Sequence, residues 1–405
     1  MKSWAVKLGK GIGAMKRDGI WRGGKRSVQS FFKLFGKVGS GDILFISSGV
    51  GDSAKYRSER QAEELSLHGF KCSVTVQDNP LLSRYADRFK IFIFQKTIYS
   101  KTVAKLIENI KAQKKEIIFE ADDLVYNPEY IRRMDFFEKM NALEKKQYET
   151  GVGSEILNDD YVKTCVTTTA YLAEKLKAYG KNAFVSKNKL SNYDVEAADH
   201  ILGTKSPNGD LVPKIVISGD KIKIGYFSGT ASHDKDFETV KDALTNILEK
   251  YPQVELHLFG PLEIDDIYAK FGDRVKKNPF ASWEKHLENI AGVDINIAPL
   301  EIGNPFCESK SELKFIEAGI VGVPIVVAAT QTFQEAIEDS VDGFVAGDDE
   351  EWKEKLEKLI SNQDLRKSMG QKAREKVLRE YTNKNSHNEE YYNYLKSKIQ
   401  SSNVK

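Results

Sequence analysis

The sequence predicts an α/β protein of two Rossmann-like domains, each built on a parallel sheet, that face each other across a cleft. A chain of 405 residues is longer than one hydrophobic core usually organises, so two domains are expected. Strand-like and helix-like segments alternate along the sequence, which is typical of parallel sheets with right-handed crossovers. Two polar, Gly-bearing turns each precede a helix, and this predicts ligand contacts at strand ends.

Composition excludes several other classes of protein. The chain is 40% hydrophobic and 30% charged, which is the balance of a folded globular protein and not of a disordered one. No apolar run approaches the roughly eighteen residues that cross a bilayer. Cys72, Cys165 and Cys307 form neither a CxxC pair nor a disulfide framework, which favours a reducing, cytoplasmic location and argues against a structural zinc. We also expect no bound metal and no cofactor.

Residues 1–38 are predicted to form a basic amphipathic arm. Asp18 is the single acid in this stretch, and Trp4, Trp21 and Phe31 are interleaved with its cations. Such a segment is expected to lie on an anionic membrane surface, although docking on a partner or packing on its own N-terminal domain fits as well. Nucleic acid is disfavoured because no basic-aromatic reading module follows. The basic residues are Lys2, Lys7, Lys10, Lys16, Arg17, Arg22, Lys25, Arg26, Lys33 and Lys37.

The first folded domain is expected over 39–205. Strands are predicted at 42–47, 71–76, 90–94, 116–119, 161–169 and 182–185, and helices at 55–68, 101–113 and 170–179. The Gly49-Val-Gly51 turn after the first strand lacks the third Gly of a dinucleotide fingerprint, and no acid ends the second strand as expected. The pattern therefore excludes an NAD site.

Two carboxylates follow the predicted strand at 116–119. Asp122 and Asp123 would lie at the carboxyl end of a parallel strand, where open α/β sheets place ligand groups. Neighbouring carboxylates raise each other's pKa, so either could act as a general base, or one could simply cap the loop. Arg57 and Arg60, at the start of the first helix, are candidates for acceptor binding.

A linker at 206–220, which contains Ser206-Pro-Asn-Gly and Val212-Pro, separates this domain from a second one at 221–382. Its strands are predicted at 222–227, 254–259, 293–297 and 323–327, with a helix at 237–250. The strand at 222–227 runs into a polar turn before that helix, which is a phosphate-cradling geometry. Gly229, Thr230, His233 and Lys235 are its candidate donor-binding residues, and the alternative is an ordinary helix cap.

The segment 304–329 carries the strongest site prediction. Leu313, Ile316 and Ile320 recur on one helix face, whereas Lys310, Lys314 and Glu317 fall together on another near the helix start. Two ammonium groups at a helix entrance, where first-turn N–H groups lack intrahelical partners, predict an anion site. The alternative is a solvated face with charge pairs one turn apart.

Glu317-Ala-Gly-Ile-Val-Gly-Val-Pro-Ile-Val326 resembles the donor-binding signature of GT-B glycosyltransferases of the family 4 / group 1 type. The resemblance implies that Glu317 binds the ribose of a nucleotide sugar. Ser309 stands where many members carry a Glu that contacts the transferred sugar, and Lys310-Ser-Glu-Leu-Lys314 is similar to a subset with a Lys-Ser-x-x-Lys pattern. The Asp122-Asp-Leu124 segment matches the same subfamily, and the resemblance implies that the C-terminal segment, 383–405, returns to the N-terminal domain.

The predicted activity is transfer of a sugar from a nucleotide diphosphate sugar to a glycan or lipid-linked acceptor at the cytoplasmic membrane face. Lys310 and Lys314 would neutralise the leaving phosphate, so no metal is needed, and the resemblance favours retention of the anomeric configuration. It also implies a place in polysaccharide, lipopolysaccharide or capsule synthesis. Two alternatives stay open. One is a nucleotide-sugar epimerase of the same fold. The other is a non-catalytic scaffold subunit, which is suggested by Ser309 in place of the usual Glu.

Overall fold

The structure is a computed structural model that describes residues 38–49, 51–131, 137, 142–203, 221–229, 234–262 and 264–402. The predicted arm, except for Val38, and the predicted linker at 206–220 lie outside the described residues, as do Thr230 and His233. The described chain forms two compact units. The first comprises 38–49, 51–131, 142–189 and 386–402, and the second comprises Phe137, 190–203 and the described residues of 221–385.

The first unit contains a six-stranded sheet in the order β2-β1-β3-β4-β5-β6 in which all neighbouring strands are parallel. The central strands β1 and β3 are buried along their whole length, because helices cover both faces of a doubly wound sheet. Their near-continuous apolar sequences made these strands predictable. The strands are β1 (Ile43–Ser47), β2 (Cys72–Val76), β3 (Ile91–Gln95), β4 (Glu116–Ala121), β5 (Thr164–Thr167) and β6 (Asn182–Val185).

The helix after β1 is continuous from α3 into α4 but contains a π-helical turn, η1. Such turns occur mostly as single insertions in α-helices, and they are frequent at functional sites. The first unit's helices are α3 (Asp52–Ala54), η1 (Lys55–Glu59), α4 (Arg60–Leu67), η2 (Leu82–Tyr85), α5 (Lys101–Ala112), α6 (Pro128–Ile131), α7 (Ala142–Tyr148), α8 (Ser154–Leu157), α9 (Ala170–Lys177) and α19 (Glu389–Ser401).

The second unit contains another six-stranded parallel sheet, in the order β12-β11-β10-β7-β8-β9. The two edge strands were not predicted, since β9 is polar (Val-Lys-Lys-Asn) and β12 has only three residues. The strands are β7 (Ile222–Phe227), β8 (Val254–Phe259), β9 (Val275–Asn278), β10 (Ile295–Ala298), β11 (Ile325–Ala328) and β12 (Phe344–Ala346).

The helix predicted at 237–250 is in fact two helices, α11 and α12. They are separated at Val240, whose backbone (φ −114°, ψ 10°) is not helical. The second unit's helices are α10 (Asn192–Leu202), α11 (Asp234–Glu238), α12 (Lys241–Lys250), η3 (Asp266–Arg274), α13 (Trp283–Ala291), α14 (Pro305–Glu308), α15 (Leu313–Ile320), α16 (Gln331–Ala336), α17 (Asp349–Ser361) and α18 (Gln363–Glu380).

Each sheet has one point at which the strand order reverses. In the first sheet this point lies between β1 and β3, and in the second it lies between β7 and β10. Open α/β sheets bind ligands outside the carboxyl ends of their strands at such a point. We therefore expect ligand-binding residues in the loops after Ser47 and Gln95 of the first sheet, and in the loops after Phe227 and Ala298 of the second.

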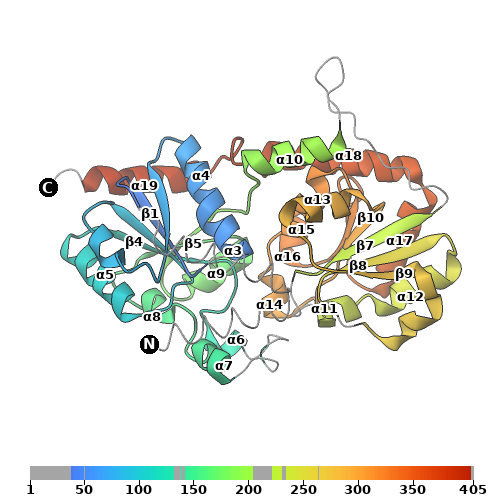
Figure 1. The fold of residues 1–405 in the computed structure, drawn as a ribbon, viewed down its shortest axis with the longest axis horizontal. Coiled ribbons are helices and arrows are strands. Elements are labelled where there is room, and N and C mark those ends of the chain that lie inside the picture. Colours follow the sequence, from blue (N-terminus) through green and yellow to red (C-terminus); the bar gives the residue numbers. More distant parts are fainter. Residues whose placement is uncertain are drawn as a thin grey trace, which may run out of the picture. The chain divides into compact units, whose positions relative to one another are not determined.

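The chain passes into the second unit at Leu190 and returns to the first at Ser386. Figure 1 shows the red helix α19 among the blue and green elements of the first unit. Tyr391, Tyr392 and Leu395 of this helix are buried in the core that β1 and β3 build. The C-terminal helix is thus part of the first unit's hydrophobic core.

Buried Glu64 of α4 bonds to both of the segments in which the chain crosses between the two units. Its Oε2 lies 2.7 Å from Nζ of Lys189, the last residue before the first crossing, and its Oε1 accepts hydrogen bonds from Ser386 Oγ (2.7 Å) and Tyr392 OH (2.5 Å). In the second unit, backbone hydrogen bonds connect Leu190 with Tyr381 and with Asn383. Hydrogen bonds therefore connect the two crossing segments within the first unit and again within the second.

Candidate functional site

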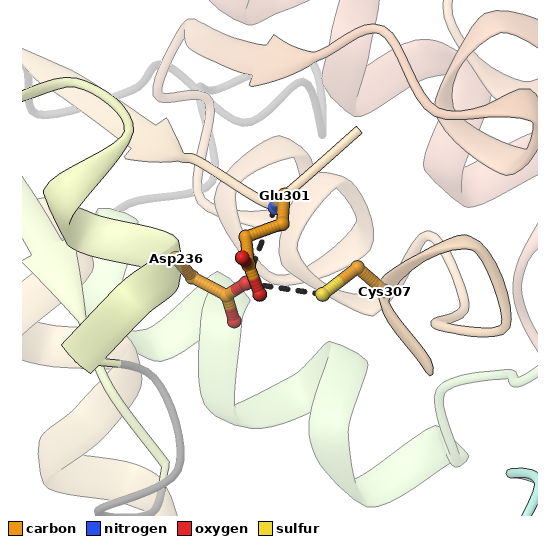
Figure 2. Close-up of side chains that lie close together, drawn as sticks. All are labelled: Asp236, Glu301 and Cys307. Carbon is orange, nitrogen blue, oxygen red and sulfur yellow. Dashed lines mark hydrogen bonds between the residues drawn. The ribbon is translucent and has the colours of Figure 1, made fainter. Parts of the chain in front are cut away.

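A buried aspartate joins the two loops at the reversal point of the second sheet. Asp236 Oδ1 accepts the backbone N–H of Glu301 at 3.3 Å, in the loop after β10, and the thiol of Cys307 at 3.1 Å, on α14 (Figure 2). Asp236 is on α11, which follows the polar turn after β7. Asp236 was not predicted as a site residue, because nothing in the neighbouring sequence shows that its partners come from a distant loop.

The same three side chains bring their ligand atoms within 4.8 Å of one another, a spacing that would suit a metal ion. A cysteine must lose its proton to bind a metal. Burial and the nearby Asp236 raise the pKa of Cys307 well above its ordinary value, and the thiol donates a hydrogen bond to Asp236. Glu301 accepts a hydrogen bond from Asn304 at 2.9 Å. The cluster is accounted for by these hydrogen bonds, which fasten the loops together.

The predicted site residues Ser309 and Lys310 lie between two helices. The helix α15 begins at Leu313, so Lys310 is in the turn that follows α14 and not on the helix face, contrary to the sequence prediction. Ser309 is fully buried, and its hydroxyl donates to the carbonyl of Phe306 at 2.7 Å. The ammonium group of Lys310 lies 5.8 Å from the centroid of the Phe306 ring.

Glu317, on α15, is the centre of a charged triad. Its Oε2 lies 3.2 Å from Nε2 of His286 and 3.4 Å from Nζ of Lys314. Burial alone would raise the pKa of Glu317, but the charges and hydrogen bonds of Lys314 and His286 outweigh it and lower the pKa to about 2. The carboxylate is therefore ionised at every physiological pH. His286, on α13, was not predicted, since a single histidine within an amphipathic helix carries no distinguishing pattern.

The polar turn after β7 is described in part. Gly229 is exposed, and a Cβ atom added to it would meet nothing within 4 Å. Lys235 is exposed on α11, directly before Asp236. Thr230 and His233, the other two predicted residues, lie outside the described residues. Among the described residues nothing crowds Gly229, and Asp236 secures α11, which begins at Asp234.

In the first unit, Lys96 lies between the two predicted carboxylates. Its Nζ is 2.6 Å from Asp122 Oδ1 and 2.9 Å from Asp123 Oδ2. Lys96 directly follows β3 and has a left-handed backbone (φ 42°), a conformation that non-glycine residues adopt rarely and often at functional sites. Ser53 also donates to Asp122, at 2.7 Å. All of these groups lie at the reversal point of the first sheet.

The expectation that Asp122 and Asp123 raise each other's pKa is wrong for Asp122. Burial acts to raise its pKa, but Lys96, the hydroxyl of Ser53 and the charge of Arg57 together lower it. The lysine, which comes from the neighbouring strand, supplies the opposite charge that the local sequence lacks. Asp122 is therefore held as an ionised partner of Lys96, which makes it a weaker base than the sequence suggested.

Arg57, a predicted acceptor-binding residue, is fully buried in an ion pair. Its Nε lies 2.5 Å from Glu120 Oε1, and its Nη1 donates to Ser186 O (2.8 Å) and Asn188 Oδ1 (3.2 Å). Burial raises the pKa of Glu120 to about 7, although Arg57 offsets part of this effect. Arg60, the second prediction, places its guanidinium 3.7 Å from the centroid of the Tyr56 ring. Both arginines lie on the helical run that contains the π turn.

Within the described ranges, no helix combines the length and the apolar character that crossing a bilayer requires.

Comparisons with known proteins agree with this architecture. Residues 240–389 match a protein family described as "Glycosyl transferase-like". No protein of curated function matches the sequence at a significant level. Among solved structures, HepE from Anabaena, in complex with UDP and glucose, is 15% identical with a TM-score of 0.53, over 89% of this chain and 100% of that one.

Two further solved structures share the fold over comparable lengths. A glycosyltransferase from Rickettsia africae is 13% identical with a TM-score of 0.58, over 91% of this chain and 100% of that one. Sucrose-phosphate synthase from Thermosynechococcus elongatus is 13% identical with a TM-score of 0.52, over 90% and 98%. The two parallel sheets with their covering helices therefore form the GT-B fold.

Proposed function

We propose that this chain, which has the GT-B fold and matches a family described as "Glycosyl transferase-like" over residues 240–389, is a glycosyltransferase that moves a sugar from a UDP-sugar to a glycan or lipid-linked acceptor. The observation that carries the proposal is Glu317, a buried and ionised carboxylate held by Lys314 and His286 within the matched segment. The presence of UDP and glucose in the Anabaena HepE structure supports uridine as the base.

The donor site we propose lies in the second unit. Glu317 binds the ribose hydroxyls, and Lys314 and Lys310 neutralise the charge that develops on the diphosphate as the sugar leaves. Preorganised cations at a leaving group are among the largest contributions to catalysis, and their loss typically lowers the rate by about 10²-fold or more. Gly229, Thr230, His233 and Lys235 contact the diphosphate, and Ser309 lies near the transferred sugar.

The acceptor site we propose lies in the first unit, at the reversal point that contains Lys96, Asp122 and Asp123. Because Asp122 is stabilised in its ionised form, its role is to orient an acceptor hydroxyl or to hold Lys96, and Asp123 is the candidate base. Arg57 supports the site through Glu120. We propose that transfer retains the anomeric configuration and needs no divalent metal. The anomeric configuration of the product, determined by NMR, tests the first point. Turnover measured in the presence of a chelator tests the second.

A thermal-shift panel tests the donor directly. Purified protein is heated with UDP-, GDP-, dTDP- and CMP-sugars, and a UDP-sugar is expected to raise the unfolding temperature most. A ligand at about one hundred times its dissociation constant stabilises the folded state by about 2.7 kcal/mol. A larger shift with another base would correct the choice of uridine, and no shift with any of the four would count against a nucleotide-sugar enzyme.

We also propose that the basic arm, residues 1–38, holds the enzyme at the cytoplasmic face of an anionic membrane, as in the synthesis of a polysaccharide, lipopolysaccharide or capsule. Each Lys or Arg near such a surface contributes about 1 kcal/mol, and the attraction weakens with salt. The full chain is expected to co-sediment with vesicles that contain phosphatidylglycerol, and a chain lacking 1–37 is not. Equal sedimentation of the two chains would contradict the proposal.

A further inference from the structure

His286 is the second residue bonded to Glu317, and the proposed function gives it no role of its own toward the nucleotide. Its Nε2 lies 3.2 Å from Glu317 Oε2, closer than the ammonium of Lys314 at 3.4 Å. We propose that His286 is a positioning residue for ribose recognition, which orients the Glu317 carboxylate toward the nucleotide. This inference rests on the proposed function, since it takes the carboxylate to bind the ribose.

The imidazole ring is itself held in place by aromatic neighbours. The ring of Phe227 meets it edge to face, with centroids 5.4 Å apart and an interplanar angle of 88°, and the indole of Trp283 lies 5.9 Å away. Phe227 in turn stacks on Phe259 at 4.4 Å. Because packing fixes the orientation of the ring, the direction of its Nε2–H bond toward Glu317 is fixed as well.

Lys314 is less suited to hold the carboxylate. Its side chain is 31% exposed, compared with 21% for His286, and a lysine has more rotatable bonds than a histidine. Both side chains bind the same oxygen of Glu317. If Lys314 turns toward an arriving diphosphate, His286 still holds the carboxylate in its orientation. The triad thus divides two tasks: the histidine orients the ribose ligand, and the lysine meets the phosphate.

The test compares the binding of UDP and 2′-deoxy-UDP by titration calorimetry on the full chain, because only the former presents both ribose hydroxyls. Loss of a hydrogen bond to a charged group corresponds to about a tenfold or larger change in affinity. The wild type is therefore expected to prefer UDP by at least about tenfold. His286→Phe, which keeps an aromatic ring but has no donor, is expected to lose most of this preference, as is Glu317→Gln.

Two further variants separate positioning from a general disturbance of the fold. His286→Gln retains an N–H donor and is expected to retain most of the preference, so it also covers the case in which the phenylalanine variant does not fold. His257→Phe is the matched control, since His257 forms a similar pair with Glu255 (3.0 Å) on β8, and it is expected to leave the preference unchanged.

Each outcome has a distinct meaning. If His286→Phe keeps the wild-type preference for UDP over 2′-deoxy-UDP while Glu317→Gln loses it, the role of His286 is overturned. The assignment of the donor site then still stands. Preserved preference in both variants, or a wild type that does not distinguish the two nucleotides, would overturn the ribose assignment itself. If the thermal-shift panel selects a ribonucleotide other than UDP, the same comparison is made with that nucleotide and its 2′-deoxy form.

Discussion

Replacing Glu317 by alanine is expected to lower sugar transfer by about 10²-fold or more while the protein stays folded. A carboxylate that binds two ribose hydroxyls contributes two charged hydrogen bonds, each of about 1.5–3 kcal/mol, and 1.4 kcal/mol corresponds to a factor of ten. The variant also removes the carboxylate to which Lys314 and His286 are bonded. The measurement is kcat/KM from nucleotide release, with the unfolding temperature recorded in parallel.

Glu354→Ala is the matched control for this experiment. Glu354 is another helical glutamate of the second unit that pairs with a lysine, Lys358, but its side chain is exposed. Its replacement is expected to change neither turnover nor stability measurably, because exposed ion pairs of this kind contribute little. Lys314→Ala is expected to lower transfer to a similar extent as Glu317→Ala. Near-normal turnover in both of these site variants would refute the donor site.

Replacing Lys189 by methionine is expected to destabilise the first unit by about 3–5 kcal/mol. The Glu64 and Lys189 side chains are only 3% and 7% exposed, so removing one partner leaves a buried charge without its counterion. A double variant, Glu64→Leu with Lys189→Met, is expected to recover part of the loss, since it removes both charges. The free energy of unfolding is measured in urea, with α19 aromatics as the reporter. Equal stability of Lys189→Met and the wild type would contradict the importance of this pair.

The same pair predicts how the stability depends on pH. Burial acts to raise the pKa of Glu64, but Lys189, Tyr392 and Ser386 outweigh it, so the pKa is lower in the folded state than its ordinary value of 4.5. A lowered carboxyl pKa contributes stability that is fully present above the ordinary value and is lost as the pH falls through the folded value. The wild type is therefore expected to lose more stability below pH 4.5 than the double variant does.

Local sequence patterns predicted the backbone well, because buried parallel strands are continuous apolar runs. β6 and β7 begin and end at the predicted residues, whereas the polar β9 and the short β12 carry no such signal. The two-domain α/β fold and its family resemblance followed from these runs and from the motif around Glu317.

Interactions between distant segments could not be predicted in the same way. Lys96 reaches Asp122 from the adjacent strand, and His286 reaches Glu317 from a separate helix, so neither pair has a fixed spacing in the sequence. For this reason the low pKa of Asp122 and the existence of the triad appear only in three dimensions. Arg57 is a similar case, since its partner Glu120 is an apparently ordinary strand residue.

The first unit is discontinuous in the sequence, because Ser386 and the helix α19 complete a core that begins at Ile43. During synthesis on the ribosome, that core stays open until Tyr391, Tyr392 and Leu395 have emerged, by which time the whole of the second unit has already been translated. The second unit can therefore fold before the first one is complete, because the first unit needs a helix that is synthesised after the second unit.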